Sequence, residues 1–432
     1  MVRLLACLLC VLAIAAAGCG PGVPAAASAR VEVDLGAIGR AFEPRLRGVM
    51  VGSWENPASL SIMAAHWRDA EVTFLEFPGG LEASDGSYDW QASRPSQIGP
   101  DQFAALADAA GAAVRMCIAD YGANDPAKAA AWVAANRECG WGAAYWEVGD
   151  EEYGAWAGHA APGEYAARFR AYHQAMKAAD PAIKVGAPVT VYDPWWTRTV
   201  LAYIGDIVDW VALSYYPQDP GGESDAALLA APGCLGGLIA DLRQWLAEAA
   251  PGRKVEIIIT GWGSVSYNPG PQTLSAVNGL FTADAIGAMA AAGVDAAGLF
   301  CSQMDVLSTG GTYGLFGTGA DPGAARPAYW GLKAWAGAAG NLVACASDAP
   351  ELSCRAVAGA NGILLVLINR DPARRFTADI ALAGYAPPAG WMTVSLYGRD
   401  QPVLAETARR APAAEFCLDV PPHTLAVVHM PG

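Results

Sequence analysis

An alternation of short apolar runs with helix-like stretches occupies the chain from residue 45 to residue 338. Apolar runs of strand length, each followed by a helical pattern, form βα units, and their strands lie parallel because every helix crosses back over the sheet. Eight such units predict an α/β fold, a closed (β/α)8 TIM barrel, which we place at residues 40–338. The expected strands are Leu46–Val51, Val72–Phe77, Val114–Ala119, Tyr145–Gly149, Ile183–Ala187, Trp210–Ser214, Val255–Thr260 and Ala297–Cys301.

The pattern changes after Ala338, where short strand-like runs are separated by Pro, Gly and Asp turns. Residues 339–432 are therefore expected to form a C-terminal antiparallel β-sandwich domain. The segment Arg30–Leu35 alternates in the same way, so we expect residues 30–36 to add an N-terminal strand to this sandwich. The expected C-terminal strands are Gly359–Asn369, Phe376–Leu382, Met392–Leu396 and Thr424–His429.

The N-terminus has the features of an export signal. A lone cation precedes the apolar run Leu4–Ala17, which has the length of a signal-peptide core. The run ends in Ala-Ala-Gly-Cys at Ala16–Cys19, which resembles a bacterial lipobox. Residues 1–18 are therefore predicted to be a lipoprotein signal peptide, and residues 19–29 a tether that begins at a lipidated Cys19. The chain is expected to be exported and lipid-anchored to the bacterial cell envelope, or else to be secreted.

Charge and aromatic content narrow the range of partners. The net charge of −15 argues against a nucleic-acid partner, because phosphate binding requires a basic surface. The chain has 15 Trp and 15 Tyr residues, and their rings can either pack in the core or present flat surfaces to sugars. An oligo- or polysaccharide partner fits this composition better than a nucleic acid does.

Cysteine spacing gives no metal pattern. Seven cysteines follow Cys19, an odd number, and most are expected to be small buried residues. Cys345 and Cys354 flank a turn-like segment and could bridge a hairpin, which an exported chain permits. The sequence contains no cofactor motif, and we predict neither a cofactor nor a metal site.

Acidic residues gather where the predicted barrel strands end. Function in a barrel of this type lies at the C-terminal ends of the strands. Glycoside hydrolysis uses two carboxyl groups there, one as proton donor and one as nucleophile or base, although such acids also bind metals or form salt bridges. The acids in question are Glu76, Asp120, Glu147, Asp150, Glu151 and Asp305.

The segment Trp146–Glu151 reads Trp-Glu-Val-Gly-Asp-Glu. It resembles the Trp-Glu-(Ile/Val)-Gly-Asn-Glu signature of clan A glycoside hydrolases, especially the α-L-arabinofuranosidase-like family. This resemblance implies a retaining glycosidase barrel followed by a sandwich. It also implies that Glu151 is the general acid/base and that Asp150 replaces the Asn that binds the sugar 2-hydroxyl.

Further motifs follow in the same order as in that family. Phe77–Gly80 resembles its Arg-(Phe/Tyr)-Pro-Gly-Gly loop, and Ala119–Gly122 resembles Val-Asn-Tyr-Gly. Ser214–Gln218 resembles His-Trp-Tyr-Pro-Gln, and Thr260–Ser266 resembles Thr-Glu-(Tyr/Trp)-Asn-Ser-Val-Ser. The resemblance therefore covers most of residues 40–430.

Departures from the family pattern cluster at the expected site. Gly261 stands where the family has its nucleophilic Glu, Glu76 replaces the Arg that steadies that nucleophile, and Ser214 replaces a His. Asp120 and Asp150 replace two Asn residues. An Arg beside an empty nucleophile position would lose its anionic partner, whereas a Glu beside an intact nucleophile would face like-charge repulsion. The pair Gly261 and Glu76 avoids both problems, so the standard retaining mechanism is not expected.

Three functions remain open from the sequence. The first is a glycosidase with a rebuilt site, in which Glu151 is the acid and Glu76, Asp120 or Asp150 the second carboxylate. The second is a non-catalytic carbohydrate-binding pseudo-glycosidase, and the third is another enzyme class on the same barrel, such as a transglycosylase or a lyase. Trp195 and Trp196 are either substrate platform or packing. The residues expected to contact substrate are Trp54, Tyr121, Trp146, Tyr153, Ser214, Tyr216, Gly261 and Trp262.

Overall fold

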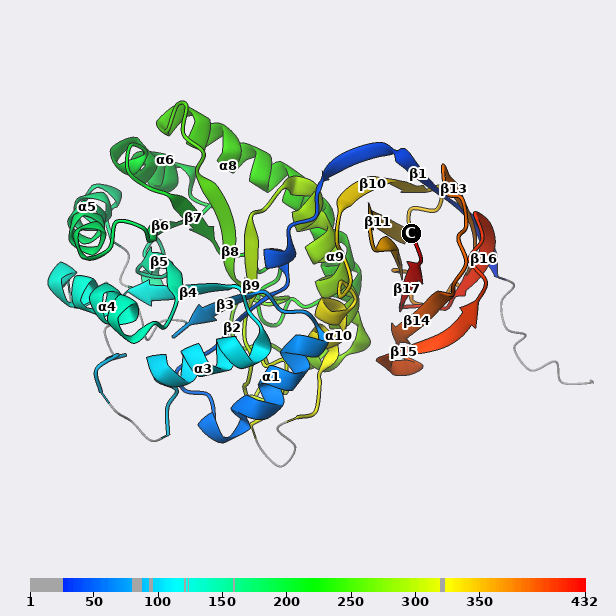
Figure 1. The fold of residues 1–432 in the computed structure, drawn as a ribbon, viewed down its shortest axis with the longest axis horizontal. Helices are drawn as coiled ribbons and strands as arrows, with labels where there is room; N and C mark the ends of the chain where they lie inside the picture. The colour runs from blue at the N-terminus through cyan, green and yellow to red at the C-terminus, as the bar shows by residue number, and fades with distance from the viewer. Residues whose placement is uncertain are drawn as a thin grey trace, which may run out of the picture.

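The computed structural model places a barrel beside a curled β-sheet, with the N-terminal strand running from the sheet into the barrel (Figure 1). The structure describes residues 26–79, 88–92, 96–119, 122, 124–157, 160–318 and 323–432.

Eight parallel strands close the barrel in chain order, as the alternation of apolar runs and helices predicts. Each strand pairs in parallel with the next, and the last pairs with the first. The predicted fold class is confirmed. The barrel strands are β2 (Gly48–Met50), β3 (Phe74–Phe77), β4 (Val114–Ala119), β5 (Ala143–Val148), β6 (Lys184–Val189), β7 (Trp210–Leu213), β8 (Glu256–Trp262) and β9 (Ala296–Leu299).

Helices surround the barrel, and their ends follow from local sequence. Asp125 and Asp193 accept hydrogen bonds from the first turns of their helices, and a proline that needs no N–H partner follows each of them. The α-helices are α1 (Leu60–Asp69), α3 (Pro100–Ala110), α4 (Pro126–Cys139), α5 (Pro162–Ala179), α6 (Pro194–Ile204), α7 (Asp225–Ala230), α8 (Leu235–Ala249), α9 (Ala276–Ala292) and α10 (Pro327–Lys333). The 3-10 helices are η1 (Pro44–Leu46), η2 (Pro57–Ser59), η3 (Ala155–Ala157), η4 (Ala231–Cys234) and η5 (Pro271–Leu274).

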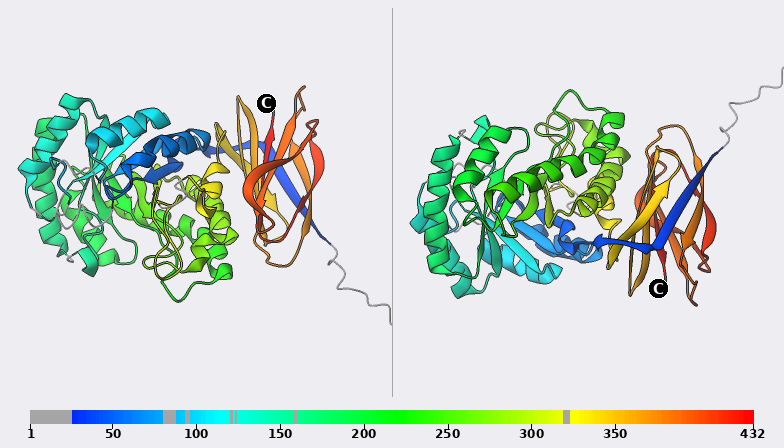
Figure 2. Two further views of the ribbon diagram at one scale, coloured as in Figure 1. Left: turned by 90° about the horizontal axis from the view of Figure 1, so that it is seen from below. Right: turned by 90° about the horizontal axis from the view of Figure 1, so that it is seen from above.

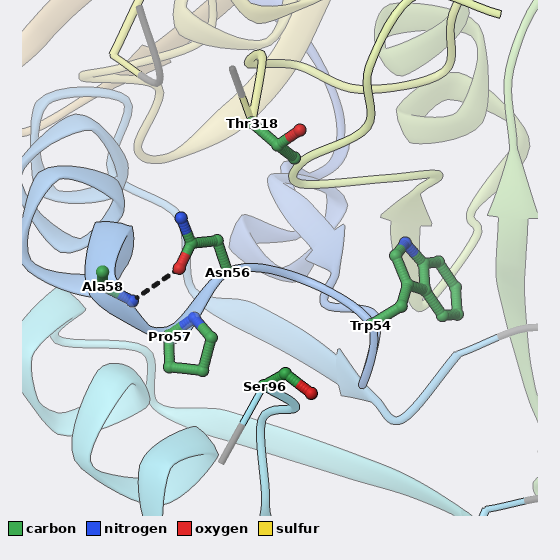
Figure 3. A pocket seen from close by; sticks show the side chains of 6 residues that line it. All are labelled: Trp54, Asn56, Pro57, Ala58, Ser96 and Thr318. Atoms are coloured by element: carbon green, nitrogen blue, oxygen red, sulfur yellow. Dashed lines mark hydrogen bonds between the residues drawn. The ribbon is translucent and has the colours of Figure 1, made fainter. Parts of the chain in front are cut away.

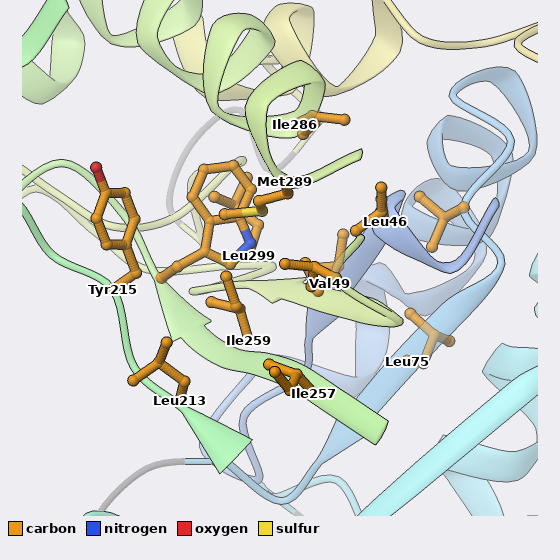
Figure 4. Packing of buried hydrophobic residues seen from close by; sticks show 14 of the residues in the cluster. Leu46, Val49, Leu75, Leu213, Tyr215, Ile257, Ile259, Ile286, Met289 and Leu299 are labelled. Atoms are coloured by element: carbon orange, nitrogen blue, oxygen red, sulfur yellow. The ribbon is translucent and has the colours of Figure 1, made fainter. Parts of the chain in front are cut away.

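Side chains alternate between the inside and the outside of the barrel wall. A small apolar cluster that includes Phe74, Tyr145 and Ile258 fills the interior. The larger cluster lies between strands and helices, where Ile259 and Leu299 pack towards Met289 of α9 (Figure 4). Because successive strand residues point to opposite faces, the residue two positions after each interior side chain also points inward.

Within the described part of the chain, one helical run, Asp225–Ala249, is apolar and long enough to cross a bilayer by length and composition alone. It consists of α7, η4 and α8. Leu235, Ile239 and Leu242 on its inner face are buried in the cluster between helices and barrel, so it packs as a core helix of the barrel.

A nine-stranded sheet forms the second part, in the order β15-β14-β17-β12-β11-β10-β1-β13-β16. All neighbours are antiparallel except β1 and β13. The sheet curls around its own apolar core (Figure 2). The strands are β1 (Ala27–Ala41), β10 (Asn341–Ser347), β11 (Leu352–Gly359), β12 (Gly362–Asn369), β13 (Phe376–Ala383), β14 (Met392–Gly398), β15 (Gln401–Arg410), β16 (Glu415–Val420) and β17 (Thr424–Met430).

The sheet packs against α9 and α10 of the barrel. Ser353 on β11 donates a hydrogen bond of 2.9 Å to the buried Asp284 on α9. A Cβ atom on Gly279 of α9 would lie 2.5 Å from the ring of Tyr397 on β14, so glycine at this position permits the close approach of the two parts.

Candidate functional site

The acidic residues that the sequence places at strand ends do meet at the C-terminal mouth of the barrel. Glu76 lies two positions after the interior residue Phe74, and Glu147 lies two positions after Tyr145. Both side chains therefore point into the barrel, above the small apolar cluster that fills its interior. Asp150 and Glu151 follow on the bend after β5. The charges of Glu76, Glu147, Asp150 and Glu151 interact, so we call these four residues the acid cluster.

Glu76 is almost fully buried, with 2% of its surface exposed. Its Oε2 atom has no hydrogen-bond partner among the described residues. A Cβ atom on Gly298 of β9 would lie 2.6 Å from Oε2, so the glycine leaves the room that this carboxyl occupies. Burial, and then the charge of Asp150, raise the pKa of Glu76 well above its usual range, which favours the protonated form near neutral pH.

Glu147 is buried more deeply still. Neither of its carboxyl oxygens has a hydrogen-bond partner within the described parts of the chain. Burial raises its pKa well above the usual range, and the charges of Asp150 and Glu76 add to the effect. This residue sits beneath the mouth and is not exposed to a ligand.

Asp150 and Glu151 are the accessible acids of the cluster, because both are half-buried at the rim. Burial and the charges of Glu151 and Glu152 raise the pKa of Asp150 well above its usual range. Glu151 has a left-handed backbone with φ of 54°, and its Oε1 accepts a hydrogen bond of 3.4 Å from the Tyr153 hydroxyl. Tyr153 also shares a hydrogen bond with Ser214, so these side chains form one polar arc.

Gly261 is the extra residue of a β-bulge in β8, between Thr260, which pairs with Gly298, and Trp262, which pairs with Leu299. Its φ of 63° lies in the left-handed region that favours glycine. A Cβ atom there would lie 3.3 Å from the Tyr216 hydroxyl. Bulges at barrel rims redirect side chains, and this one turns position 261 towards Tyr216.

A row of aromatic rings leads away from Gly261. Tyr216 contacts Tyr313 with ring centroids 6.4 Å apart, and Tyr313 contacts Phe300 at 5.0 Å. Phe300 contacts Trp54 at 6.3 Å. Trp54 is at the edge of a cavity of about 730 Å³ (Figure 3). Its wall also includes Asn56, Pro57 and Ala58 at the start of η2, with Ser96 and Thr318. Tyr216 also interacts electrostatically with Glu151, so the row leads from the acid cluster towards an open cavity.

Two sequence assignments need correction. Trp146 and Trp262 are not substrate contacts, because both are fully buried in the cluster between barrel and helices. Trp146 alternates with the inward-pointing Glu147 and so faces outward, and the bulge at Gly261 turns Trp262 outward as well. Trp54, Tyr153, Ser214, Tyr216 and Gly261 do lie at the mouth, each partly exposed.

Of the neighbouring residues Trp195 and Trp196, one packs in the protein interior and the other is exposed. Trp196 is buried and packs edge-on against Tyr153 at 5.7 Å. Trp195 is 68% exposed at the start of α6, on the same face of the barrel as the acid cluster. One is therefore packing, and the other is available to a ligand.

Several predicted residues cannot be placed in the site. Asp120, Tyr121 and the lipidation residue Cys19 lie outside the described residues. Asp305 accepts a hydrogen bond of 3.0 Å from the Thr318 backbone and braces the loop after β9.

Sequence reasoning missed Phe300 and Tyr313, which complete the aromatic row. Both belong to the region that follows β9, where no periodic pattern marks their direction. The only available signal was the position of Phe300 at a strand end. Among the described residues no group of three His, Cys, Asp or Glu side chains is arranged to hold a metal ion.

Comparison with known proteins supports the fold. No family model and no curated protein matches the chain. Among solved structures, it is similar to an α-L-arabinofuranosidase from Thermotoga maritima in complex with arabinose, with a TM-score of 0.76 and 18% identity over 94% of this chain and 100% of that one. An α-L-arabinofuranosidase from Thermotoga petrophila gives 0.77 and 19% over 93% and 99%.

A more distant enzyme shares the same architecture. A Paenibacillus polymyxa xyloglucanase gives a TM-score of 0.69 at 12% identity, over 94% of this chain and 100% of that one. Likenesses at such identities establish a barrel with an attached β-domain, and proteins of this shape include the arabinofuranosidases that the sequence motifs resemble.

Proposed function

We propose that this chain is a carbohydrate-active protein that binds an oligo- or polysaccharide at the mouth of a glycoside hydrolase-like barrel. The observation that carries the proposal is a row of half-buried aromatic rings that leads from Tyr216, whose hydroxyl interacts electrostatically with Glu151, to a ligand-sized cavity. Aromatic rings offer flat apolar surface to the C–H faces of sugars, and a partly exposed carboxyl beside them can serve a glycosidic oxygen.

If the site hydrolyses its ligand, Glu151 is the candidate general acid. Its proton passes to the glycosidic oxygen as the bond from that oxygen to the anomeric carbon breaks. A water molecule attacks the anomeric carbon and gives its proton to a second carboxylate. Asp150 is the accessible candidate among the described residues, while Glu76 and Asp120 are the other candidates from the sequence. An inverting reaction places this water between the two carboxyl groups.

A second candidate function is carbohydrate binding without hydrolysis. Gly261 offers no nucleophile, and Glu76 is buried and favours its protonated form. A base at neutral pH would then have to come from Asp150, whose pKa is also raised. This shortage of an ionised second carboxylate is the specific observation that favours a pseudo-glycosidase.

The two candidates differ in the behaviour of two isosteric variants. Arabinofuranosides, arabinan and xylan are the test substrates. If the protein is a hydrolase, Glu151→Gln should lower turnover by about 10²–10⁴-fold, as expected for loss of a general acid. Asp150→Asn resembles protonated Asp150, so it should keep turnover if Asp150 only donates a hydrogen bond and lose it if Asp150 is the base. Glycan binding by wild type with no turnover would establish the second function, and absence of both would reject the proposal.

A complementary experiment examines the empty nucleophile position. Azide or formate added to wild type should restore turnover only if the rest of a retaining site is intact. Gly261→Glu alone is a weaker test, because φ of 63° strains any side chain and the neutral Glu76 carboxyl offers the new carboxylate no positive partner. The double variant Gly261→Glu with Glu76→Arg supplies that partner and should be compared with Glu76→Arg alone.

We further propose that the mature protein is exported and held at the bacterial cell envelope by a lipid on Cys19. The lipobox-like end of the signal segment supports this placement. In a bacterial host, the wild type should partition with membranes, and Cys19→Ser should move the protein to the soluble exported fraction. A Cys139→Ser variant is the matched control, and an unchanged distribution of Cys19→Ser would reject the anchor.

A further inference from the structure

A second cavity, of about 450 Å³, lies between the barrel and the sheet, far from the acid cluster in the chain. Its walls come from both parts of the molecule. The barrel contributes Asp225 at the start of α7 and Trp330 of α10, and the sheet contributes Tyr397, Arg399 and His423. Small-molecule sites commonly occupy 300–1,000 Å³ at such domain boundaries, so this volume is that of a ligand site.

His423 is the distinctive residue of this cavity. Its side chain is only 3% exposed, and its Nδ1 atom has no hydrogen-bond partner among the described residues. The backbone N–H of His423 donates a hydrogen bond of 3.0 Å to the Asp371 carbonyl, and the imidazole contacts the backbone of Arg370. A buried acceptor without a donor is destabilising, and a ligand donor in the cavity would satisfy it.

The backbone of His423 is unusual too. Its φ of 43° lies in the left-handed region, where a side chain other than glycine is strained. Burial lowers the pKa of its imidazole, and the positive charge of Arg399 adds to the effect, so the ring is neutral at pH 7. A neutral imidazole whose other nitrogen faces a backbone carbonyl leaves Nδ1 as a hydrogen-bond acceptor.

The rest of the cavity wall combines an aromatic surface with two charged side chains. Trp330 is half-buried and offers one aromatic surface, while the exposed Arg399 and Asp225 carry opposite charges at the rim. Asp225 accepts a hydrogen bond of 2.8 Å from the Gln272 side chain, which fixes its carboxylate. The two charges cancel, so the cavity favours neither an anion such as phosphate nor a cation. A neutral ring with several hydroxyl groups matches the acceptor, the flat wall and the paired charges.

We propose that this cavity is a second carbohydrate site, which takes one sugar ring at the boundary between barrel and sheet. A sugar hydroxyl donates to Nδ1 of His423, the C–H face of the ring packs on Trp330, and Arg399 and Asp225 bond further hydroxyls. The proposal does not rest on catalysis at Glu151, because no residue of the cavity belongs to the acid cluster. A long glycan could then bind to the protein at two separate places, the barrel mouth and this cavity.

Ligand-observed NMR on the full chain, with L-arabinose, D-xylose and D-galactose as probes, tests this site. At least one sugar should bind to wild type and should still bind to Glu151→Gln and Trp54→Ala after any signal from the barrel mouth is lost. Arg399→Ala and His423→Asn should weaken that binding at least tenfold. Asn tolerates positive φ, so the second variant keeps the local backbone. Arg409→Ala is the matched control, because Arg409 is an exposed arginine of the same sheet that pairs with Glu406 outside the cavity.

The outcomes separate this proposal from that for the barrel mouth. Sugar binding that Trp54→Ala or Glu151→Gln removes, and that Arg399→Ala and His423→Asn leave intact, would overturn the second site while supporting the first. Preferential binding of inorganic phosphate, or no sugar signal that depends on Arg399 or His423, would also overturn it. Circular dichroism and thermal unfolding of both variants show whether they are folded.

Discussion

At the scale of single residues, the barrel holds carboxyl groups under unusual conditions. Glu76 and Glu147 are buried, and three of their four oxygens have no hydrogen-bond partner among the described residues. Burial without compensation favours the neutral form, which explains why the pKa of each is raised. The mouth of the barrel is thus less negative at neutral pH than its sequence indicates.

The raised pKa of these buried carboxyl groups makes the folded state less stable as pH rises. Since the folded-state pKa of Glu147 is raised, the native state keeps a proton that the unfolded chain releases, and stability falls as pH rises above the ordinary carboxyl pKa. Glu147→Gln removes that loss. The variant should be more stable than wild type by about 1–3 kcal/mol at pH ~8 and nearly equal at pH ~4. Denaturant unfolding at both pH values measures the difference.

The control for this prediction is Glu138→Gln, because Glu138 is exposed on α4. It should change stability little at either pH. A Glu147→Gln variant that is less stable than wild type at high pH would show that Glu147 is ionised and paired with a group outside the described residues.

The sequence could place some residues of the candidate site and not others, depending on whether a motif or a strand pattern fixes their direction. Glu151 and Tyr216 lie in motifs whose place at strand ends followed from the barrel, so the sequence put them at the mouth. Trp146 was misassigned although strict alternation with Glu147 would have turned it outward. Trp262 could not be assigned in that way, because the bulge at Gly261 reverses the alternation and the sequence does not mark a bulge.

At the scale of elements, the strands that the sequence predicts are those with strong apolar patterns. β4 has the bounds that were expected, and the other barrel strands differ at their ends by a few residues. β10, β11, β15 and β16 were not predicted. β15 and β16 are the two edges of the sheet, and β15 is mostly exposed, so no apolar alternation is needed there.

One hairpin of this sheet carries a pair of facing thiols. Continuing the register of β10 and β11 from Val343 and Ala356 brings Cys345 opposite Cys354. Their side chains are hydrogen-bonded and both are free thiols in the structure. Opposite residues of an antiparallel pair are close enough for a disulfide to form.

We therefore expect oxidation to join these two cysteines. Each thiol gives up a proton and an electron to a disulfide reagent or to oxygen as the S–S bond forms. Mass spectrometry should show the loss of two hydrogen atoms and a peptide linking Cys345 to Cys354. The bond should stabilise the oxidised protein by about 2–3 kcal/mol over its reduced form. Cys345→Ser should abolish both effects, whereas Cys417→Ser should not, and linkage of any other pair would contradict this expectation.

At the scale of the whole molecule, barrel and sheet form one packed unit through α9 and α10. Gly279 of α9 lies against Tyr397 of β14 and the carbonyl of Pro327, at distances that leave no room for a methyl group. The boundary between the two parts therefore depends on a residue without a side chain.

A pair of glycine substitutions tests this dependence. Gly279→Ala should lower stability by about 1–3 kcal/mol through overpacking and should separate the unfolding of sheet and barrel. Gly237→Ala, on the open face of α8 where nothing lies within 4 Å, should instead raise stability by about 0.5 kcal/mol. Calorimetry shows whether one transition becomes two. Equal behaviour of both variants would mean that the boundary is loose.

The position of β1 has a consequence for the time at which the sheet can be completed. The strand lies inside the sheet between β10 and β13, and the backbone N–H of Arg30 donates a hydrogen bond to the side chain of Asp348, 318 residues further along the chain. A ribosome therefore releases β1 before the barrel, and its neighbours in the sheet emerge only after the entire barrel. β1 must therefore remain without its sheet partners until synthesis is nearly finished. A chaperone that protects the emerging chain from aggregation would have to protect β1 for longer than any other strand of the sheet.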